Sequence, residues 1–122
     1  MAPAKGQCYS REEIKSITGG SIYPCLVRVN GIIVAVCLRF DMNPEAPDIY
    51  LNGNGPNMIR DCDLLRRQTI RFPVFVKRSD NRWEFMGYYL VKEFKSDSAT
   101  INKHKKNSGR NDIYGVVFLK AA

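Results

Sequence analysis

The sequence predicts one α+β domain: a curved, mostly antiparallel sheet or partly open β-barrel of about six strands, with two short helices. Three observations lead to this expectation. Apolar, β-branched segments recur in pairs joined by short polar turns, as in β-hairpins. Two other segments carry apolar residues at helical spacing. The 122 residues with 44% hydrophobic content suit a single core, so residues 1–122 are interpreted as one domain whose residues 1–9 are flexible.

Two segments carry the signals of short helices. The first, expected over residues 11–18, begins at Ser10 and Glu13, which form a capping box. The second, expected over residues 57–68, follows Pro56, a residue that suits the first turn of a helix. Its apolar side chains recur at helical spacing and its arginines fall outside that stripe.

Six segments have the composition of strands. They are residues 23–29, 32–40, 49–51, 70–76, 82–94 and 113–120. Asn30-Gly31 joins the first two and is the strongest short hairpin signal, while the polar residues 77–81 join the fourth and fifth. Because residues 33–38 are apolar at every position, we expect this strand at the centre of the sheet, covered on both faces.

The charge balance points to a polyanionic partner. Nineteen Lys and Arg against twelve Asp and Glu give a net charge of +7. Such an excess attracts nucleic acid through counterion release and electrostatic steering, so DNA or RNA is the first partner to test. No apolar run approaches the roughly 20 residues that span a bilayer, and no membrane association is expected. We expect a monomer.

The cysteines indicate a reducing compartment, nuclear or cytoplasmic. Cys8, Cys25, Cys37 and Cys62 are scattered without a C-x-x-C pair, and only one His accompanies them. This spacing does not suit a zinc site, so no metal or other cofactor is expected. The last three cysteines lie in apolar contexts, where a free thiol acts as a small hydrophobic side chain.

A polar, Lys-rich stretch precedes the last strand. Residues 95–110 are interpreted as a basic loop that contacts phosphates and positions a nucleic acid without reading its sequence. The alternative is a solvated loop whose lysines only keep the protein soluble. The candidate phosphate contacts in this stretch are Lys103, His104, Lys105, Lys106 and Arg110.

A second basic cluster ends the second helix. Arg66, Arg67 and Arg71 would complement the negative end of the helix dipole, which is sufficient reason for their presence. If they share a face with the basic loop, the two clusters would hold a nucleic-acid backbone on both sides of a recognition site.

Candidate base contacts lie near a Gly-rich turn and on the long fifth strand. Asp48, Tyr50 and Asn54 combine an acceptor, a ring and an amide beside backbone that a ligand can approach. The alternative is an Asx-turn that only begins a helix. On the fifth strand, period-2 alternation places Tyr88 on the face opposite Trp83, so that Tyr88 could present its ring to a base.

The fourth and fifth strands carry a family resemblance. The run Phe72-Pro73-Val74-Phe75-Val76-Lys77, a polar turn and the W-x-x-x-G-x-Y-x-V pattern of residues 83–91 resemble the SRA-like and wider PUA-like modified-base readers. The similarity covers roughly residues 48–94 and includes the Gly55-Pro56 turn before the helix.

The resemblance implies a crescent-shaped barrel that flips a modified base out of duplex DNA and stacks it on an aromatic ring. By position, Asp48, Tyr50 and Asn54 would then form the base pocket, and residues 95–110 would act as an inserted finger or phosphate clamp.

Catalytic patterns are weak. His104 has no nucleophile nearby in the sequence, and Gly53-x-Gly55 lacks the remaining glycine of a dinucleotide fingerprint. Pro47-Asp48 followed by Glu93-Phe94-Lys95 is similar to a metal-dependent nuclease pattern, but no further acid supports it.

We therefore expect no enzyme. The sequence favours a DNA reader that recognises a base, modified or not, with basic loops on the phosphates. The alternatives are a general single-strand or RNA binder and a protein-interaction domain without a nucleic-acid role.

Overall fold

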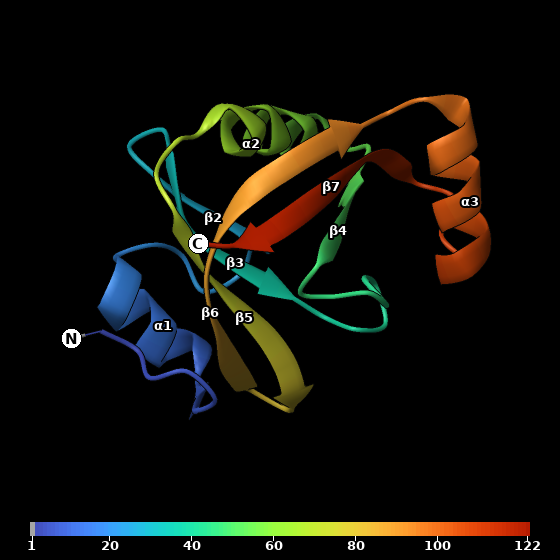
Figure 1. Ribbon diagram of the computed structural model, residues 1–122. Helices are drawn as coiled ribbons and strands as arrows, with labels where there is room; N and C mark the ends of the chain where they lie inside the picture. Colours follow the sequence, from blue (N-terminus) through green and yellow to red (C-terminus); the bar gives the residue numbers. More distant parts are fainter. Residues whose placement is uncertain (1) are drawn as a thin grey trace.

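In the computed structural model, which describes residues 2–122, a strongly curled sheet forms an open half-barrel with helices around it (Figure 1). The order along the sheet is β2-β3-β5-β6-β7-β4, and the short β1 pairs with β6 beside this path. The predicted α+β class with a partly open barrel is confirmed. Over the described residues there are seven strands and three helices, one of each more than predicted.

The elements have the following bounds. The strands are β1 Cys8–Tyr9, β2 Leu26–Val29, β3 Ile32–Leu38, β4 Ile49–Gly53, β5 Phe72–Ser79, β6 Arg82–Lys95 and β7 Ile113–Ala121. The helices are α1 Arg11–Thr18, α2 Pro56–Arg67 and α3 Ser98–Ser108.

The first hairpin and the central strand follow the prediction. Asn30 and Gly31 both have positive φ, 51° and 78°, as a two-residue turn between β2 and β3 requires. β3 pairs antiparallel with β2 and parallel with β5, so both of its edges are bonded. Its residues from Ala35 to Leu38 are buried, which confirms the expected central strand.

A β-bulge in β6 changes which face each ring occupies. Val74 pairs with Gly87 whereas Phe75 pairs with Phe85, so β6 carries one extra residue at this point. The bulge shifts the period-2 alternation, and Tyr88 packs on the same cluster as Trp83 and Phe85. The predicted placement of Tyr88 on the opposite face is therefore wrong.

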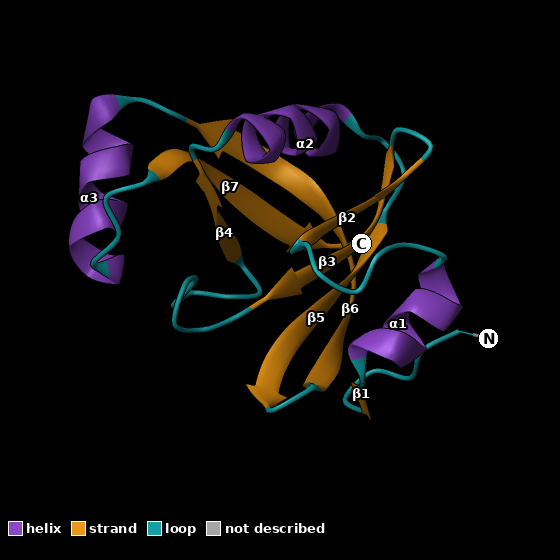
Figure 2. Cartoon of the chain, turned by 180° about the vertical axis from the view of Figure 1, so that it is seen from behind, coloured by secondary structure: helices purple, strands orange, loops and turns teal. Residues whose placement is uncertain are grey.

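The two faces of the sheet have separate cores. One cluster, centred on Tyr50 and Phe72, is closed by Cys62 and Leu65 of α2. The other, centred on Phe75, is closed by Ile14 of α1. Figure 2 shows α2 lying across one end of the curled sheet and α1 near the end of the β5–β6 hairpin.

The Lys-rich stretch is a helix rather than the predicted loop. The Asp97 side chain accepts a hydrogen bond from the Thr100 backbone N–H at the start of α3, and Gly109, with φ of 74°, ends it. α3 docks on β7 through Ile101 and through His104, whose ring meets Phe118 edge-on at 6.2 Å between centroids. This apolar docking stabilises a helix that its polar composition does not reveal.

The N-terminal segment, for which we expected flexibility, pairs with β6 in the structure. Residue 1 lies outside the described residues. The Gly6 N–H donates to the Phe85 carbonyl, and the Phe85 N–H donates to the Gln7 carbonyl, each at 2.9 Å. β1 continues this pairing along β6 and brings α1 against the sheet.

Candidate functional site: a cationic pocket in the open side of the half-barrel

A pocket of about 320 Å³ lies between β3 and β4. These two strands stand near opposite ends of the strand order. The loop of residues 39–48 connects these two strands and forms part of the wall. We call this cavity the cationic pocket. Its lining residues are Arg11, Ile22, Tyr23, Cys25, Cys37, Arg39, Met42, Asn43, Tyr50, Leu51, Met58, Lys77, Trp83 and Arg110.

Aromatic rings form part of the pocket at different depths. Trp83 is buried in the wall, with 7% of its surface exposed. Tyr23 has 85% of its surface exposed, which places it at the mouth. Met42 is also exposed and lines the same cavity. Exposed apolar side chains around a cavity are typical of a binding site.

The lining is positively charged. It includes Arg11, Arg39, Lys77 and Arg110, and none of the described residues that line it is an Asp or Glu. Arg39 forms an ion pair with Asp41, and Arg110 forms one with Asp112; the two aspartates lie outside the lining. In the part of the chain that the structure describes, Arg11 and Lys77 form no ion pair. The pocket therefore suits electron-rich or anionic groups.

Tyr50 closes the floor of the pocket through a buried polar network. Its hydroxyl donates to Asn52 Oδ1 at 2.7 Å and lies 3.4 Å from Cys25 Sγ. Asn52 in turn donates from Nδ2 to the carbonyls of Gly53 and Met58. Burial raises the pKa of Tyr50 well above its ordinary value, so the phenol stays neutral.

Of the three residues predicted to form a base pocket, the structure places one in the cavity. Tyr50 lines it, but only 1% of its surface is exposed, so little of the ring is open to a ligand. Asp48 and Asn54 are exposed and do not belong to the lining. Asp48 uses its backbone carbonyl to accept from the Leu119 N–H at 2.8 Å.

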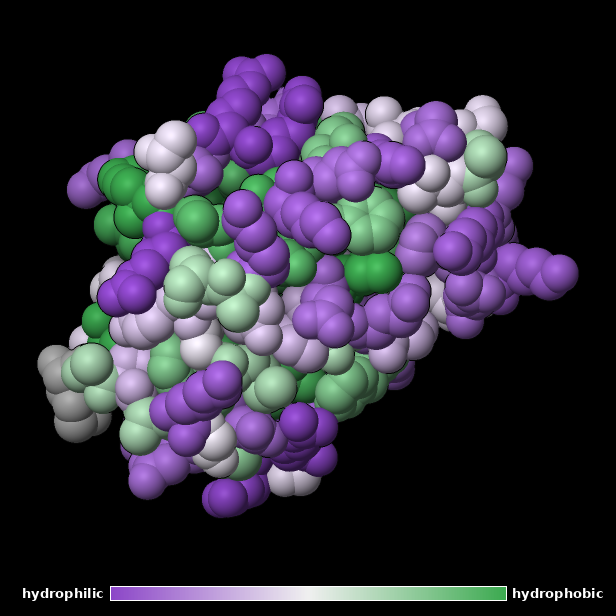
Figure 3. All heavy atoms as spheres, viewed as in Figure 1, coloured by the Kyte–Doolittle hydropathy of each residue, from purple (hydrophilic) through white to green (hydrophobic). Residues whose placement is uncertain are grey.

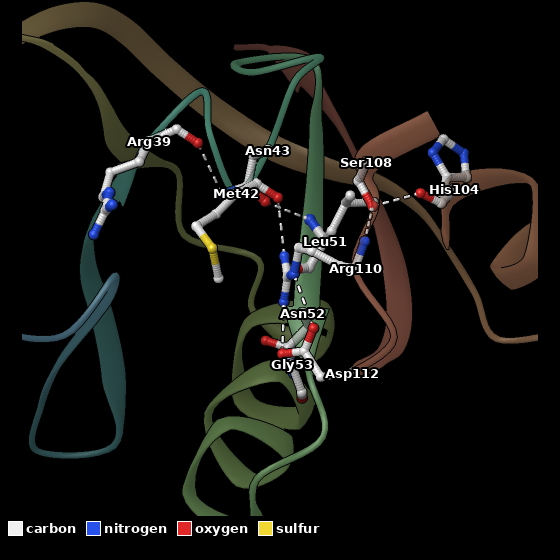
Figure 4. Close-up of polar contacts among 10 residues, drawn as sticks. All are labelled: Arg39, Met42, Asn43, Leu51, Asn52, Gly53, His104, Ser108, Arg110 and Asp112. Carbon is white, nitrogen blue, oxygen red and sulfur yellow. Dashed lines mark hydrogen bonds and ion pairs between the residues drawn. The ribbon is translucent and has the colours of Figure 1, made fainter. Parts of the chain in front are cut away.

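Arg110 lines the pocket but is engaged within the protein (Figure 4). Its Nη1 donates to the carbonyls of Met42 and Leu51 at 3.0 and 2.9 Å. Its Nε and Nη2 hold both carboxylate oxygens of Asp112. Asn43 reinforces the same region by accepting the Leu51 N–H at 2.8 Å. Arg110 thus ties the start of β7 to the pocket loop and to β4, instead of being a free phosphate contact.

The remaining candidates in the Lys-rich stretch divide by exposure. Lys103 and Lys106 are exposed and Lys105 is half-buried. Figure 3 shows mostly hydrophilic side chains at the end of the molecule where α3 lies. His104 faces inward, with 3% of its surface exposed and Nδ1 at 3.3 Å from Glu45 Oε2. His104 is therefore part of the docking surface of α3.

The second basic cluster is spread over rings rather than gathered at the pocket. Arg66 pairs with Asp63 and its guanidinium lies 4.8 Å from the Phe94 ring centroid. The Arg71 guanidinium lies 4.3 Å from the Tyr88 ring centroid, and the same ring packs edge-on against Phe85. Arg67 is exposed. None of these residues lines the cationic pocket.

No metal site or membrane span is evident among the described residues. Over residues 2–122, no group of three or more His, Cys, Asp or Glu is arranged to hold a metal ion. No helix in this range has the length and apolar composition to cross a bilayer. All four cysteines are free thiols.

The comparisons with known proteins return no match. No family model, no curated protein and no solved structure matches this chain.

The buried thiols are expected to resist alkylation. Burial raises the pKa of both Cys37 and Cys62 to about 12, so neither forms the reactive thiolate at mildly alkaline pH. Iodoacetamide applied to the native protein at about pH 8.5, near the ordinary pKa of a thiol, should therefore modify the half-buried Cys8 and Cys25 first. Peptide mass spectrometry distinguishes the four sites, with denatured protein as the control. Rapid native labelling of Cys62 would contradict this assignment.

Proposed function

We propose that this protein binds nucleic acid and admits an unstacked base, unmodified or modified, to the cationic pocket. The observation that supports this most is the lining itself, which combines aromatic rings and cations with no Asp or Glu among its described residues. Aromatic rings stack on any base, and positive charge attracts the phosphate backbone. The exposed lysines of α3 and the net charge of +7 would supply contacts outside the pocket.

The geometry of the sheet is compatible with this reading. Because the half-barrel is open between its edge strands β2 and β4, a group can enter the cavity without displacing a strand. The hydrogen-bonding groups along the wall include the Arg11 guanidinium, whose Nε has no partner within the described residues, and the Cys25 thiol. Such groups would read the polar edge of a base while the rings contact its faces.

The test is fluorescence-polarisation binding at low and at physiological salt. Matched duplexes and single strands would carry cytosine, 5-methylcytosine, 5-hydroxymethylcytosine or N6-methyladenine. We expect Tyr23→Ala to weaken binding about tenfold, about 1.4 kcal/mol, because base–aromatic stacking contributes about 1–3 kcal/mol per base. Since Tyr23 is 85% exposed, its removal leaves the core intact.

Ile70→Ala is the matched control, because Ile70 is an exposed apolar residue, 55% accessible, outside the pocket lining. A preference for one modified duplex that Tyr23→Ala removes and Ile70→Ala preserves would support base reading. Equal, salt-sensitive binding to every oligonucleotide would leave a general single-strand, duplex or RNA binder. Absence of binding at both salt concentrations would contradict the proposal and favour a protein partner.

A further inference from the structure

We propose that the cationic pocket selects a ligand that carries an oxyanion on or beside an aromatic base, and that Arg11 recognises this oxyanion. The oxyanion is either a phosphate or a carboxylate. This inference rests on the proposed function and deepens it, because it assigns a chemical class to what enters the pocket. Three features of Arg11 and its surroundings support it.

The first feature is a buried guanidinium with an unused donor. Only 8% of the Arg11 surface is exposed, although it lines the pocket. Its Nη2 donates to the Pro24 carbonyl at 2.9 Å and to the Ser21 carbonyl at 3.4 Å. Its Nε is buried and has no hydrogen-bond partner within residues 2–122. A buried donor without an acceptor is unfavourable, so the site is incomplete by itself.

The second feature is the missing countercharge. The two acids that follow Arg11 on α1 are directed elsewhere. Glu12 accepts from Asn81 Nδ2, and Glu13 accepts from the Ser10 N–H to close the capping box. The carbonyls that accept from Arg11 carry no net charge. A buried cation without an anionic partner is strongly unfavourable, and an oxyanion from the ligand would supply that partner.

The third feature is a second cation, Lys77, which lies near the same Trp83 ring as Arg11. The Arg11 guanidinium carbon lies 5.2 Å from the centroid of the Trp83 ring, and Lys77 Nζ lies 5.8 Å from it. These cation–π contacts offset part of the cost of holding two like charges near one indole. Lys77, like Arg11, forms no ion pair within the described chain. An anion beside Trp83 would therefore meet two available cations.

The other two arginines of the pocket explain why Arg11 is singled out. Arg39 is held by Asp41, and Arg110 by Asp112, so their charges are compensated within the protein. A cationic group would be repelled, and a neutral base would leave Arg11 and Lys77 uncompensated. An oxyanion next to a ring satisfies the cations and contacts Trp83 at the same time. In nucleic acids this chemistry has two sources, the phosphate of a nucleotide and a carboxylate on an oxidised base.

The single tryptophan of the chain is Trp83, so its intrinsic fluorescence reports directly on the pocket. The full chain would be titrated with deoxycytidine, deoxycytidine 5′-monophosphate and 5-carboxy-2′-deoxycytidine. We expect at least one of the two anionic probes to bind at least tenfold more tightly than deoxycytidine. Which probe shows this gain identifies the source of the oxyanion.

Protection of Cys25 from alkylation is the second readout, since Cys25 lines the pocket and Cys8 does not. Each probe that binds should slow the modification of Cys25 and leave that of Cys8 unchanged. This readout covers the case in which a bound ligand leaves the fluorescence of Trp83 unaltered.

Arg11→Gln is expected to abolish the tenfold preference for the anionic probe, and Arg11→Lys to restore part of it through charge alone. Lys15→Gln is the matched control, because it removes one exposed cation from the same helix without touching the pocket. Thermal unfolding checks that each variant is folded. If Arg11→Gln does not fold, Lys77→Gln provides the same comparison with an expected loss of at least threefold.

The outcomes separate this inference from the proposed function. Equal affinity for all three probes, or an equal loss in Lys15→Gln, would overturn the role of Arg11 while leaving base binding in the pocket intact. Lack of any response by both readouts would also overturn it. If, in addition, no oligonucleotide protects Cys25 and none binds in the polarisation assay, the proposed function fails as well.

Discussion

Replacing Phe75 by alanine is expected to lower the free energy of unfolding by about 3–5 kcal/mol, the usual range for removing a fully buried phenylalanine. Phe75 is completely buried in β5. Its ring lies 5.3 Å from that of Phe85 and meets Tyr9 edge-on at 6.2 Å. β5 pairs with both β3 and β6. Removing the Phe75 ring would leave a cavity in the cluster that also contains Tyr9 of β1 and Ile14 of α1.

Urea denaturation followed by circular dichroism measures this loss. Phe40→Ala is the matched control, because Phe40 is 39% exposed and its ring centroid lies 5.2 Å from the Arg78 guanidinium carbon. We expect the control to lose about 1 kcal/mol or less. A loss at Phe75 no larger than the loss at Phe40 would mean that the Phe75 cluster contributes little to the stability of the fold.

Elements with strong local signals were predicted closely from the sequence. The capping box of Ser10 and Glu13 and the left-handed Gly19 define α1 at the predicted residues. Asn30-Gly31 fixes the β2–β3 hairpin because both residues accept positive φ without large cost. In these cases short-range backbone chemistry alone specifies the structure.

The alternation in β6 could not be predicted because bulges break it. One bulge separates Phe85 from Gly87, and a second register shift separates Val91 from Glu93. Each inserted residue turns all later side chains to the other face. Gly87 has φ of 114°, which an L side chain rarely adopts, and this glycine is the one local sign of the first bulge.

Helix α3 was missed because its stability depends on tertiary contacts. Its sequence is rich in Ser, Asn and Lys and has one large apolar residue, Ile101. Asp97 and Gly109 are recognisable cap residues in retrospect, and reading them together would have indicated a helix. His104 appeared to be a loop residue, yet it is buried against Phe118.

The cationic pocket was outside the reach of sequence reasoning because its lining comes from separate segments spread along the chain from Arg11 to Arg110. Arg11 has the appearance of an exposed residue at a helix start, and only the packing of α1 against Trp83 buries it. Lys77 was assigned to a polar turn, but it lies within β5 opposite Trp83. A buried charge is a property of the tertiary structure, so no local pattern identifies it.

Replacing Arg110 by methionine is expected to destabilise the protein by about 2–3 kcal/mol, because hydrogen bonds to charged groups contribute about 1.5–3 kcal/mol each and the released groups rehydrate in part. The Arg110 side chain is 9% exposed and donates to the Met42 and Leu51 carbonyls as well as to Asp112. Its loss would remove the Arg110 contacts that join the pocket loop to β4 and to the start of β7, and would leave the Asn43–Leu51 hydrogen bond of this region in place. We therefore also expect faster alkylation of Cys25 in the variant.

The pH dependence of this effect follows from Asp112. Its hydrogen bonds from Arg110 hold the pKa of Asp112 below the ordinary value of 3.8. A lowered carboxyl pKa stabilises the folded state above that ordinary value, and the contribution is lost as the pH falls through the lowered pKa. The stability difference between wild type and Arg110→Met should thus be largest at neutral pH and smaller at about pH 3, without vanishing, since the two carbonyl contacts do not titrate.

Urea denaturation at both pH values measures this stability difference. Asp41→Asn is the control, because it alters an exposed carboxylate whose pKa is lowered by Arg39 and which makes no contact with Arg110. A difference that grows toward acid would show that Arg110 stabilises the loop by some route other than the Asp112 pair.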